Sequence, residues 1–228
     1  MSRDQARENR NVAALDASLA SARGGKRTGG GIRARLELAA LEASGELGYR
    51  GLTVQAMLDR TGASRTSYYR EFANKSDCYS QGYAHFADAL AKDLLDRASK
   101  AGDWIAGLRG ALWYVADLAA SEPALARGLI EEVHVAGGAA LEKRKDVFER
   151  LSRAIDSARR ENESRHSPPP IAADFILSAM EAAVVKSFSL GDPKAFAAVI
   201  PDLVYIAVAM YFGDAAAKRA AACDLPGG

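Results

Sequence analysis

The feature that most constrains the fold is a pair of short helical segments separated by a glycine. Thr53 precedes the first segment and Ser64 precedes the second. Threonine and serine are favoured N-cap residues, and Gly62 with Ala63 between the segments suits a tight turn. Each segment is only about two turns long. Two such helices joined by a glycine-containing turn are typical of a helix-turn-helix.

The second short segment, which runs to about Glu71, divides into an apolar and a polar face. Tyr68 and Phe72 are four residues apart and predict a buried stripe. The other positions carry donors for phosphates or base edges, namely Arg65, Thr66, Ser67, Tyr69 and Arg70. Lys75 adds a cation at the start of the next helix, where backbone N–H groups favour a phosphate. This pattern predicts a DNA-contacting surface.

The residues around these segments resemble the N-terminal domain of the TetR family of transcriptional regulators. The resemblance in residue type and spacing lies in Gly48-Tyr49, in Leu52-Thr53-Val54 and in the run from Gly62 to Lys75. It implies a recognition helix, Ser64 to Tyr69, lying in a major groove. By position it implies base or phosphate contacts for Arg65, Thr66 and Ser67, and phosphate contacts for Thr53, Tyr69 and Lys75. Ser44 and Leu58 depart from the family pattern, which usually has an aromatic and a small residue there.

The function that the resemblance implies is that of a ligand-responsive repressor. A homodimer would hold two recognition helices about one DNA turn apart on a palindromic, double-stranded operator. A small-molecule effector that prefers a differently spaced dimer would release the DNA. The alternatives are an activator of the same type and a helical module that binds proteins without recognising DNA.

An enzyme is disfavoured by the sequence. No nucleophile context, phosphate loop or metal-binding spacing is discernible, and the three histidines, His85, His134 and His166, lie in different predicted elements. We therefore expect no catalytic residue, no metal and no cofactor.

The whole chain is predicted to be all-α, because long alanine- and leucine-rich stretches lack the alternation typical of strands. The expected organisation is a flexible N-terminal arm over residues 1–31, a three-helix DNA-binding domain over 32–78, a helical effector-binding and dimerisation domain over 79–222, and a tail over 223–228. Lys26 and Arg27 in the arm either enter a minor groove or belong to a disordered tail, and residues 12–20 could form a transient helix.

Helical periodicity and capping signals set the expected boundaries. Helices are predicted over 32–47, 53–61, 65–71, 74–99, 103–120, 124–160, 171–190 and 193–221, with a loop over 162–170. Gly137-Gly138 is a candidate interruption of the helix over 124–160. Pro201 either kinks the last helix or begins a new one.

Charge and cysteine usage suit a cytoplasmic DNA-binding protein. The net charge is only +1, but residues 1–75 hold 13 Lys and Arg against 8 Asp and Glu. The two cysteines, Cys78 and Cys223, cannot form a disulfide framework. No signal peptide is apparent, and the most apolar stretch, 195–212, contains Pro201 and falls short of the roughly 20 residues of a membrane span.

Two further sets of residues are predicted in the C-terminal two-thirds. A ligand pocket is expected among aromatic and polar side chains of the middle helices, Trp104, Trp113, Tyr114, Glu131, Glu132, His134 and Glu181, each of which could instead be a core aromatic or a solvated charge. A dimer interface is expected where the last helices are apolar on more than one face, at Phe175, Ala179, Met180, Ala183, Val204, Val208 and Phe212. The alternative for this second set is a two-sided core within one subunit.

Overall fold

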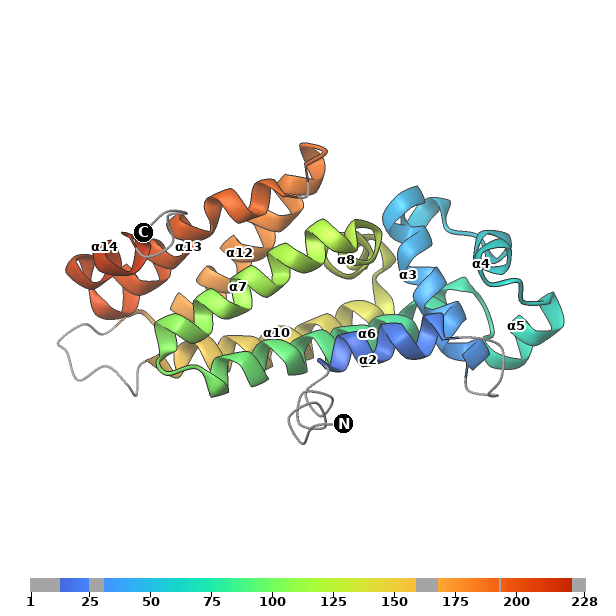
Figure 1. Cartoon of the computed structure of the whole chain (residues 1–228). Coiled ribbons are helices and arrows are strands. Elements are labelled where there is room, and N and C mark those ends of the chain that lie inside the picture. Colours follow the sequence, from blue (N-terminus) through green and yellow to red (C-terminus); the bar gives the residue numbers. More distant parts are fainter. Residues whose placement is uncertain (1–12, 25–30, 159–167, 193, 223–228) are drawn as a thin grey trace, which may run out of the picture.

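The computed structural model describes residues 13–24, 31–158, 168–192 and 194–222, and within these ranges every regular element is a helix (Figure 1). The predicted all-α class is confirmed. The helices are α2 (Ala14–Arg23), α3 (Gly31–Gly51), α4 (Val54–Thr61), α5 (Arg65–Glu71), α6 (Lys75–Lys100), α7 (Trp104–Ser121), α8 (Pro123–Ile130), α9 (Glu132–Ala136), α10 (Gly138–Asp156), α12 (Ala172–Ser189), α13 (Ala195–Phe212) and α14 (Asp214–Ala222). Cys223, the predicted tail, Lys26, Arg27, His166 and most of the predicted loop over 162–170 lie outside the described residues.

The two short helices form as their caps predict. The Thr53 hydroxyl accepts a hydrogen bond from the Ala56 N–H at 3.1 Å, and the Ser64 hydroxyl accepts one from the Ser67 N–H at 3.1 Å. Gly62 ends α4 with a φ of 66°, a left-handed conformation that glycine adopts without strain. The caps and this glycine fix the turn between α4 and α5.

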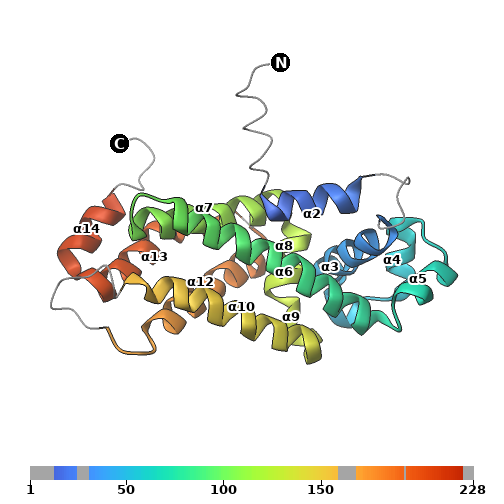
Figure 2. The ribbon, with the colours of Figure 1, turned by 90° about the horizontal axis from the view of Figure 1, so that it is seen from below.

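The helix-turn-helix stands on α3 and on the first turns of α6. Tyr68 and Phe72, the predicted buried stripe of α5, are almost fully buried. Ser44, where the family usually has an aromatic residue, is also buried and donates to the Leu41 carbonyl at 2.8 Å. Gly48, the expected helix stop, has a φ of 73° and interrupts α3 before its last turn. Helices α3, α4 and α5 gather at one end of the molecule, as both ribbon views show (Figures 1 and 2).

The long helix α6 continues from the head formed by α3, α4 and α5 into the rest of the protein. It begins at Lys75 beside α5 and packs farther along against α7 and α10. The predicted domain boundary after residue 78 therefore falls inside a continuous helix.

The N-terminal arm differs from its prediction. Residues 14–23 form α2, which packs on α3 and α6 and buries Leu15, Leu19 and Ala22. Asp93 on α6 holds the start of α2, because its carboxylate accepts the N–H groups of Ala14 and Leu15 at 2.6 and 2.8 Å. A flexible arm over residues 1–31 is thus wrong for this segment, whose stability comes from partners distant in sequence.

Glycine permits unusually close helix crossings between the two parts of the protein. A Cβ at Gly45 of α3 would overlap the Ala124 carbonyl of α8, and a Cβ at Gly128 of α8 would overlap the Leu41 carbonyl of α3. The Tyr79 hydroxyl of α6 also donates to the Gly128 carbonyl at 2.7 Å. The backbones of α3 and α8 therefore touch directly.

The C-terminal helices break at glycines. Gly137 and Gly138, with φ of 64° and 54°, separate α9 from α10, which confirms the suspected interruption. Pro201 lies inside α13, and the predicted helix over 193–221 instead divides at Gly213 into α13 and α14. The view from below shows α10, α12 and α13 beside α6 and α7 (Figure 2).

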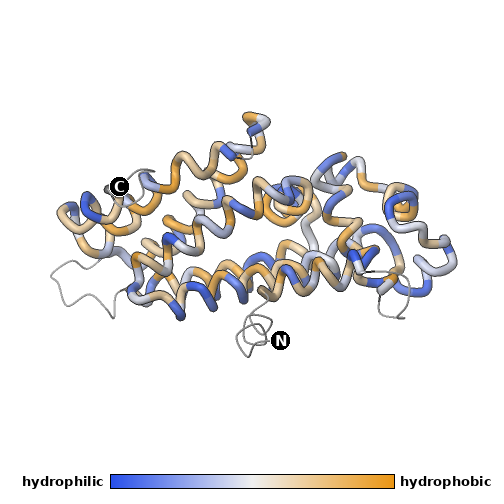
Figure 3. Tube along the Cα trace, in the orientation of Figure 1, coloured by the Kyte–Doolittle hydropathy of each residue, from blue (hydrophilic) through white to orange (hydrophobic). Residues whose placement is uncertain are grey.

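Helix α13 is the most apolar of the described helices (Figure 3). By length and composition alone it could cross a membrane. However, Phe196, Ile200, Val204 and Val208 are buried inside the protein, and α13 packs against α7, α12 and α14. This two-sided environment is typical of a core helix.

Candidate DNA interface and ligand cavity

The polar face of α5 points away from the protein. Arg65, Thr66, Tyr69 and Arg70 are exposed, and the ring of Tyr69 packs edge-on against the buried Tyr68 with centroids 5.2 Å apart. Tyr69 remains 55% exposed although it is a large aromatic residue. Thr53 and Ser64 are also exposed, whereas Ser67 is half-buried. The caps of α4 and α5 thus lie on the same outer surface as the donors.

Arg65 is held in position by a residue that the sequence did not single out. Its guanidinium donates to the Gln55 amide oxygen at 2.7 Å, and the Gln55 amide nitrogen donates to Asp59 at 2.8 Å. Gln55 and Asp59 lie one turn apart on α4, so they brace the first residue of α5 across the turn. The sequence signal for this contact is the spacing of four residues between Gln55 and Asp59 on α4, which places the two side chains next to each other on the helix surface.

Lys75, a predicted phosphate contact, makes hydrogen bonds within the protein. Its ammonium donates to the carbonyls of Tyr49 and Leu52 at 3.2 and 2.9 Å, and the carbonyl of Arg50 lies at 3.4 Å. These partners occupy its donors, and the side chain is half-buried. Lys75 therefore fastens the end of α3 to α6 instead of presenting a free cation to solvent.

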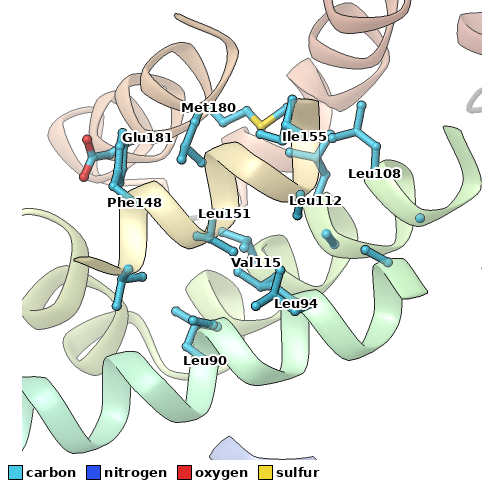
Figure 4. A pocket seen from close by; sticks show the side chains of 18 of the residues that line it. Leu90, Leu94, Leu108, Leu112, Val115, Phe148, Leu151, Ile155, Met180 and Glu181 are labelled. Atoms are coloured by element: carbon cyan, nitrogen blue, oxygen red, sulfur yellow. The ribbon is translucent and has the colours of Figure 1, made fainter. Parts of the chain in front are cut away.

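A cavity of about 730 Å³ lies between α6, α7, α10 and α12. Aliphatic side chains make most of its wall, including Leu90, Leu94, Leu112, Leu151 and Ile155 (Figure 4). This volume and lining are typical of a site for a small organic molecule.

The predicted ligand residues divide between this cavity and the outside. Trp104 and Glu181 line it. The remaining members of the predicted set do not: Trp113 is 38% exposed, Tyr114 donates to Asp93, Glu131 pairs with Arg127, Glu132 accepts the Tyr49 N–H, and His134 lies 3.5 Å from Glu181. Trp113 and Tyr114 lie on α7, which lines the cavity, but neither residue faces it. No residue of α9, which carries Glu132 and His134, lines the cavity, and which residues bind a ligand stays a prediction.

The polar group that the sequence missed in the cavity is Arg144. Its Nε donates to Glu181 Oε1 at 3.0 Å, its Nη2 donates to Oε2, and the guanidinium lies 4.1 Å from the Phe148 ring centroid. Both members of the pair are less than one-fifth exposed. A bidentate pair of this kind is neutral overall and fixed in orientation.

The predicted dimer residues also fall on two faces. Phe175 is 58% exposed, and Ala179 and Ala183 beside it are half-buried, so this stripe of α12 is available. Met180, Val204 and Val208 are buried within the subunit, and the half-buried Phe212 packs on Trp104 at 5.6 Å. The dimer interface itself stays a prediction. On α13 the large apolar side chains that remain exposed are Val199 and Ile206.

Among the described residues, no three histidine, cysteine, aspartate or glutamate side chains gather as a metal site would require. Cys78 is buried in the core and free.

Comparison with known proteins agrees with this arrangement. No protein-family model and no curated protein sequence matches the chain. Full-length TylP, a TetR regulator from Streptomyces fradiae, superimposes on it with a TM-score of 0.61 and 17% identity over 82% of this chain and 90% of that one. A TetR-family transcriptional regulator from Pectobacterium atrosepticum gives a TM-score of 0.46 and 19% identity over 86% and 93%. The likeness to TylP shows that this chain has the fold of a TetR regulator, as the resemblance around the short helices implied.

Proposed function

We propose that this protein is a cytoplasmic transcriptional repressor. It binds a palindromic operator as a homodimer and releases the operator when a small molecule binds to the protein. The observation that carries the proposal is the exposed donor face of α5, with Arg65 braced by Gln55, on a helix-turn-helix head. This face remains open to solvent although it carries two arginines and a tyrosine. In the major groove its arginine and hydroxyl groups meet base edges and phosphates.

The rest of the molecule supports the two other parts of the proposal. The cavity supplies a place for an effector, and its α6 wall continues directly into the DNA-binding head. The exposed apolar positions of α12 and α13 offer a surface for a second copy. Repression is chosen over activation because the resembled family mostly represses.

The test of DNA recognition is a gel-shift titration with the DNA upstream of the protein's own gene. Arg65→Ala and Tyr69→Ala should each weaken binding by about 1–3 kcal/mol, since each removes a side chain from the groove-facing surface. Arg153→Ala is the matched control, because Arg153 is 69% exposed but lies on α10, away from the head. Wild-type affinity in both α5 variants would refute the assignment of this face to DNA.

A further inference from the structure

The cavity is elongated. Arg144 and Ile155 both line it from α10, and eleven residues of helix span about 16 Å. Figure 4 shows Glu181 and Phe148 at one end of the labelled side chains and Leu108 and Ile155 at the other. The middle of the wall is aliphatic. A molecule that fills this space is long and mostly apolar along its body.

At the end near Leu108 and Ile155, the acidic groups already have hydrogen-bond partners or are exposed to solvent. Asp96 pairs with Lys92 at 2.6 Å and is 44% exposed, and Asp103 caps α7 by accepting the Ala106 N–H at 2.8 Å. A ligand group placed there would exchange one set of hydrogen bonds for another. This end therefore favours no particular head group.

The other end holds the hydroxyl-bearing side chain of Tyr83. This residue is 3% exposed and lines the cavity, and no hydrogen bond joins its hydroxyl to another described residue. Figure 4 shows Leu90 nearer than Leu94 to the side of Glu181 and Phe148, and Tyr83 lies two turns before Leu90 on α6, so Tyr83 lines the same end of the cavity as Arg144 and Glu181. Burial raises the pKa of this phenol. A ligand head group at this end can hydrogen-bond to the Tyr83 hydroxyl without displacing a protein partner.

The Arg144–Glu181 ion pair at this end disfavours a charged ligand head group. A ligand carboxylate would have to take Arg144 from Glu181, and an ammonium would have to take Glu181 from Arg144. Either exchange leaves one protein charge buried without its partner, which costs more than the new contact returns. A head group without charge leaves the pair intact.

We propose that the effector is an elongated, uncharged amphiphile whose single hydrogen-bonding head group pairs with the Tyr83 hydroxyl and whose apolar body runs along α10 toward Ile155. The regulatory role of this ligand rests on the proposed function. The binding chemistry follows from the cavity.

A head-group series of equal chain length tests the inference on the full-length protein. Decan-1-ol, decanoate and decylammonium are titrated while the emission of Trp104, which lines the cavity, is followed in a Trp113→Phe background. Decan-1-ol should bind at least about tenfold more tightly than either charged compound. Equal or tighter binding of a charged compound, or no saturable binding of the alcohol, would overturn the proposal.

Two variants locate the head group. Tyr83→Phe should weaken decan-1-ol binding about two- to tenfold, whereas Tyr69→Phe, on the DNA face, should leave it unchanged. Glu181→Gln removes the carboxylate partner of Arg144, so decanoate should then bind more tightly than decan-1-ol. An unchanged affinity in Tyr83→Phe, or an unchanged order of preference in Glu181→Gln, would contradict the assigned orientation.

A gel shift with the same ligands separates this inference from the proposed function. If decan-1-ol binds with the expected dependence on Tyr83 but the protein ignores operator DNA, the ligand class stands and the regulator assignment fails. If operator DNA is bound as proposed but the alcohol is not, the inference about the ligand is wrong.

Discussion

A single histidine joins the arm, the head and the long helix. His85 of α6 contacts the Glu37 carboxylate of α3 through Nδ1 at 2.9 Å and the Ser18 hydroxyl of α2 through Nε2 at 3.1 Å. Glu37 is buried and also pairs with Arg33 at 3.1 Å. The hydrogen bond that the Glu37 carboxylate accepts, aided by the negative charges of Glu37 and Asp88, raises the pKa of His85 above its usual 6.5 against the opposing effect of burial. The protonated imidazole therefore stabilises the folded state.

This shift predicts a pH dependence of stability with a definite sign. Because the folded pKa is raised, the contribution is complete below the unfolded value of 6.5 and is lost as pH rises through the folded value. The melting temperature of the wild type should fall between about pH 6 and about pH 8. His85→Gln should remove that part of the slope, so parallel curves for the two proteins would contradict the prediction. Thermal melts followed by circular dichroism suffice.

At the scale of elements, α2 connects α3 to α6 and to the turn between α7 and α8. Asp93, 4% exposed, accepts two N–H groups from its first turn and the Tyr114 hydroxyl at 3.0 Å. At the other end of α2, Arg23 forms ion pairs with Glu42 of α3 at 2.9 Å and with Glu122 between α7 and α8 at 2.6 Å. Both anchors reach across parts of the chain far from the arm in sequence.

We expect Asp93→Ala to loosen the packing of α2 on the rest of the protein. The variant leaves two N–H groups and a hydroxyl without an acceptor, so unfolding free energy should fall by about 1–3 kcal/mol. Hydrogen exchange of residues 14–23 should accelerate more than that of α3. Asp96→Ala, three residues along α6 and exposed, should change stability by less than about 0.5 kcal/mol. Unchanged protection of α2 in Asp93→Ala would mean that its apolar face alone holds it.

The elements that could be predicted from the sequence are those with local determinants. Thr53, Ser64 and Asn74 cap helices through partners three residues away, which a sequence pattern reveals. The start of α2 depends on Asp93, 78 and 79 residues distant, and no local pattern announces such an acceptor. Arg144 was missed for the same reason, since its partner Glu181 lies on another helix.

For the whole molecule, the proposed homodimer would place a second copy against the exposed faces of α12 and α13. Apolar side chains remain exposed there at Ile171, Phe175, Leu190, Val199 and Ile206. The sequence predicted this pair of helices but not the face of α13, because both of its stripes are apolar and only packing against α7 and α12 distinguishes them.

Ile206→Glu should therefore break the dimer. A charge at the centre of an apolar subunit contact loses its hydration without gaining a partner. Light scattering after size-exclusion chromatography should report the mass of one chain for the variant and of two for the wild type. Leu47→Glu is the control, since Leu47 is 53% exposed on α3 and should leave the mass unchanged. If Ile206→Glu remained dimeric, the dimer interface would not include this face of α13.

The glycine crossings have a mechanical consequence. With no side chain between α3 and α8 at Gly45 and Gly128, there is no soft layer to absorb a displacement. A small shift of α8 therefore presses directly on the backbone of α3. Under the function proposed above, this rigid contact would let a small movement of the C-terminal helices change the spacing between the two α5 helices of a dimer.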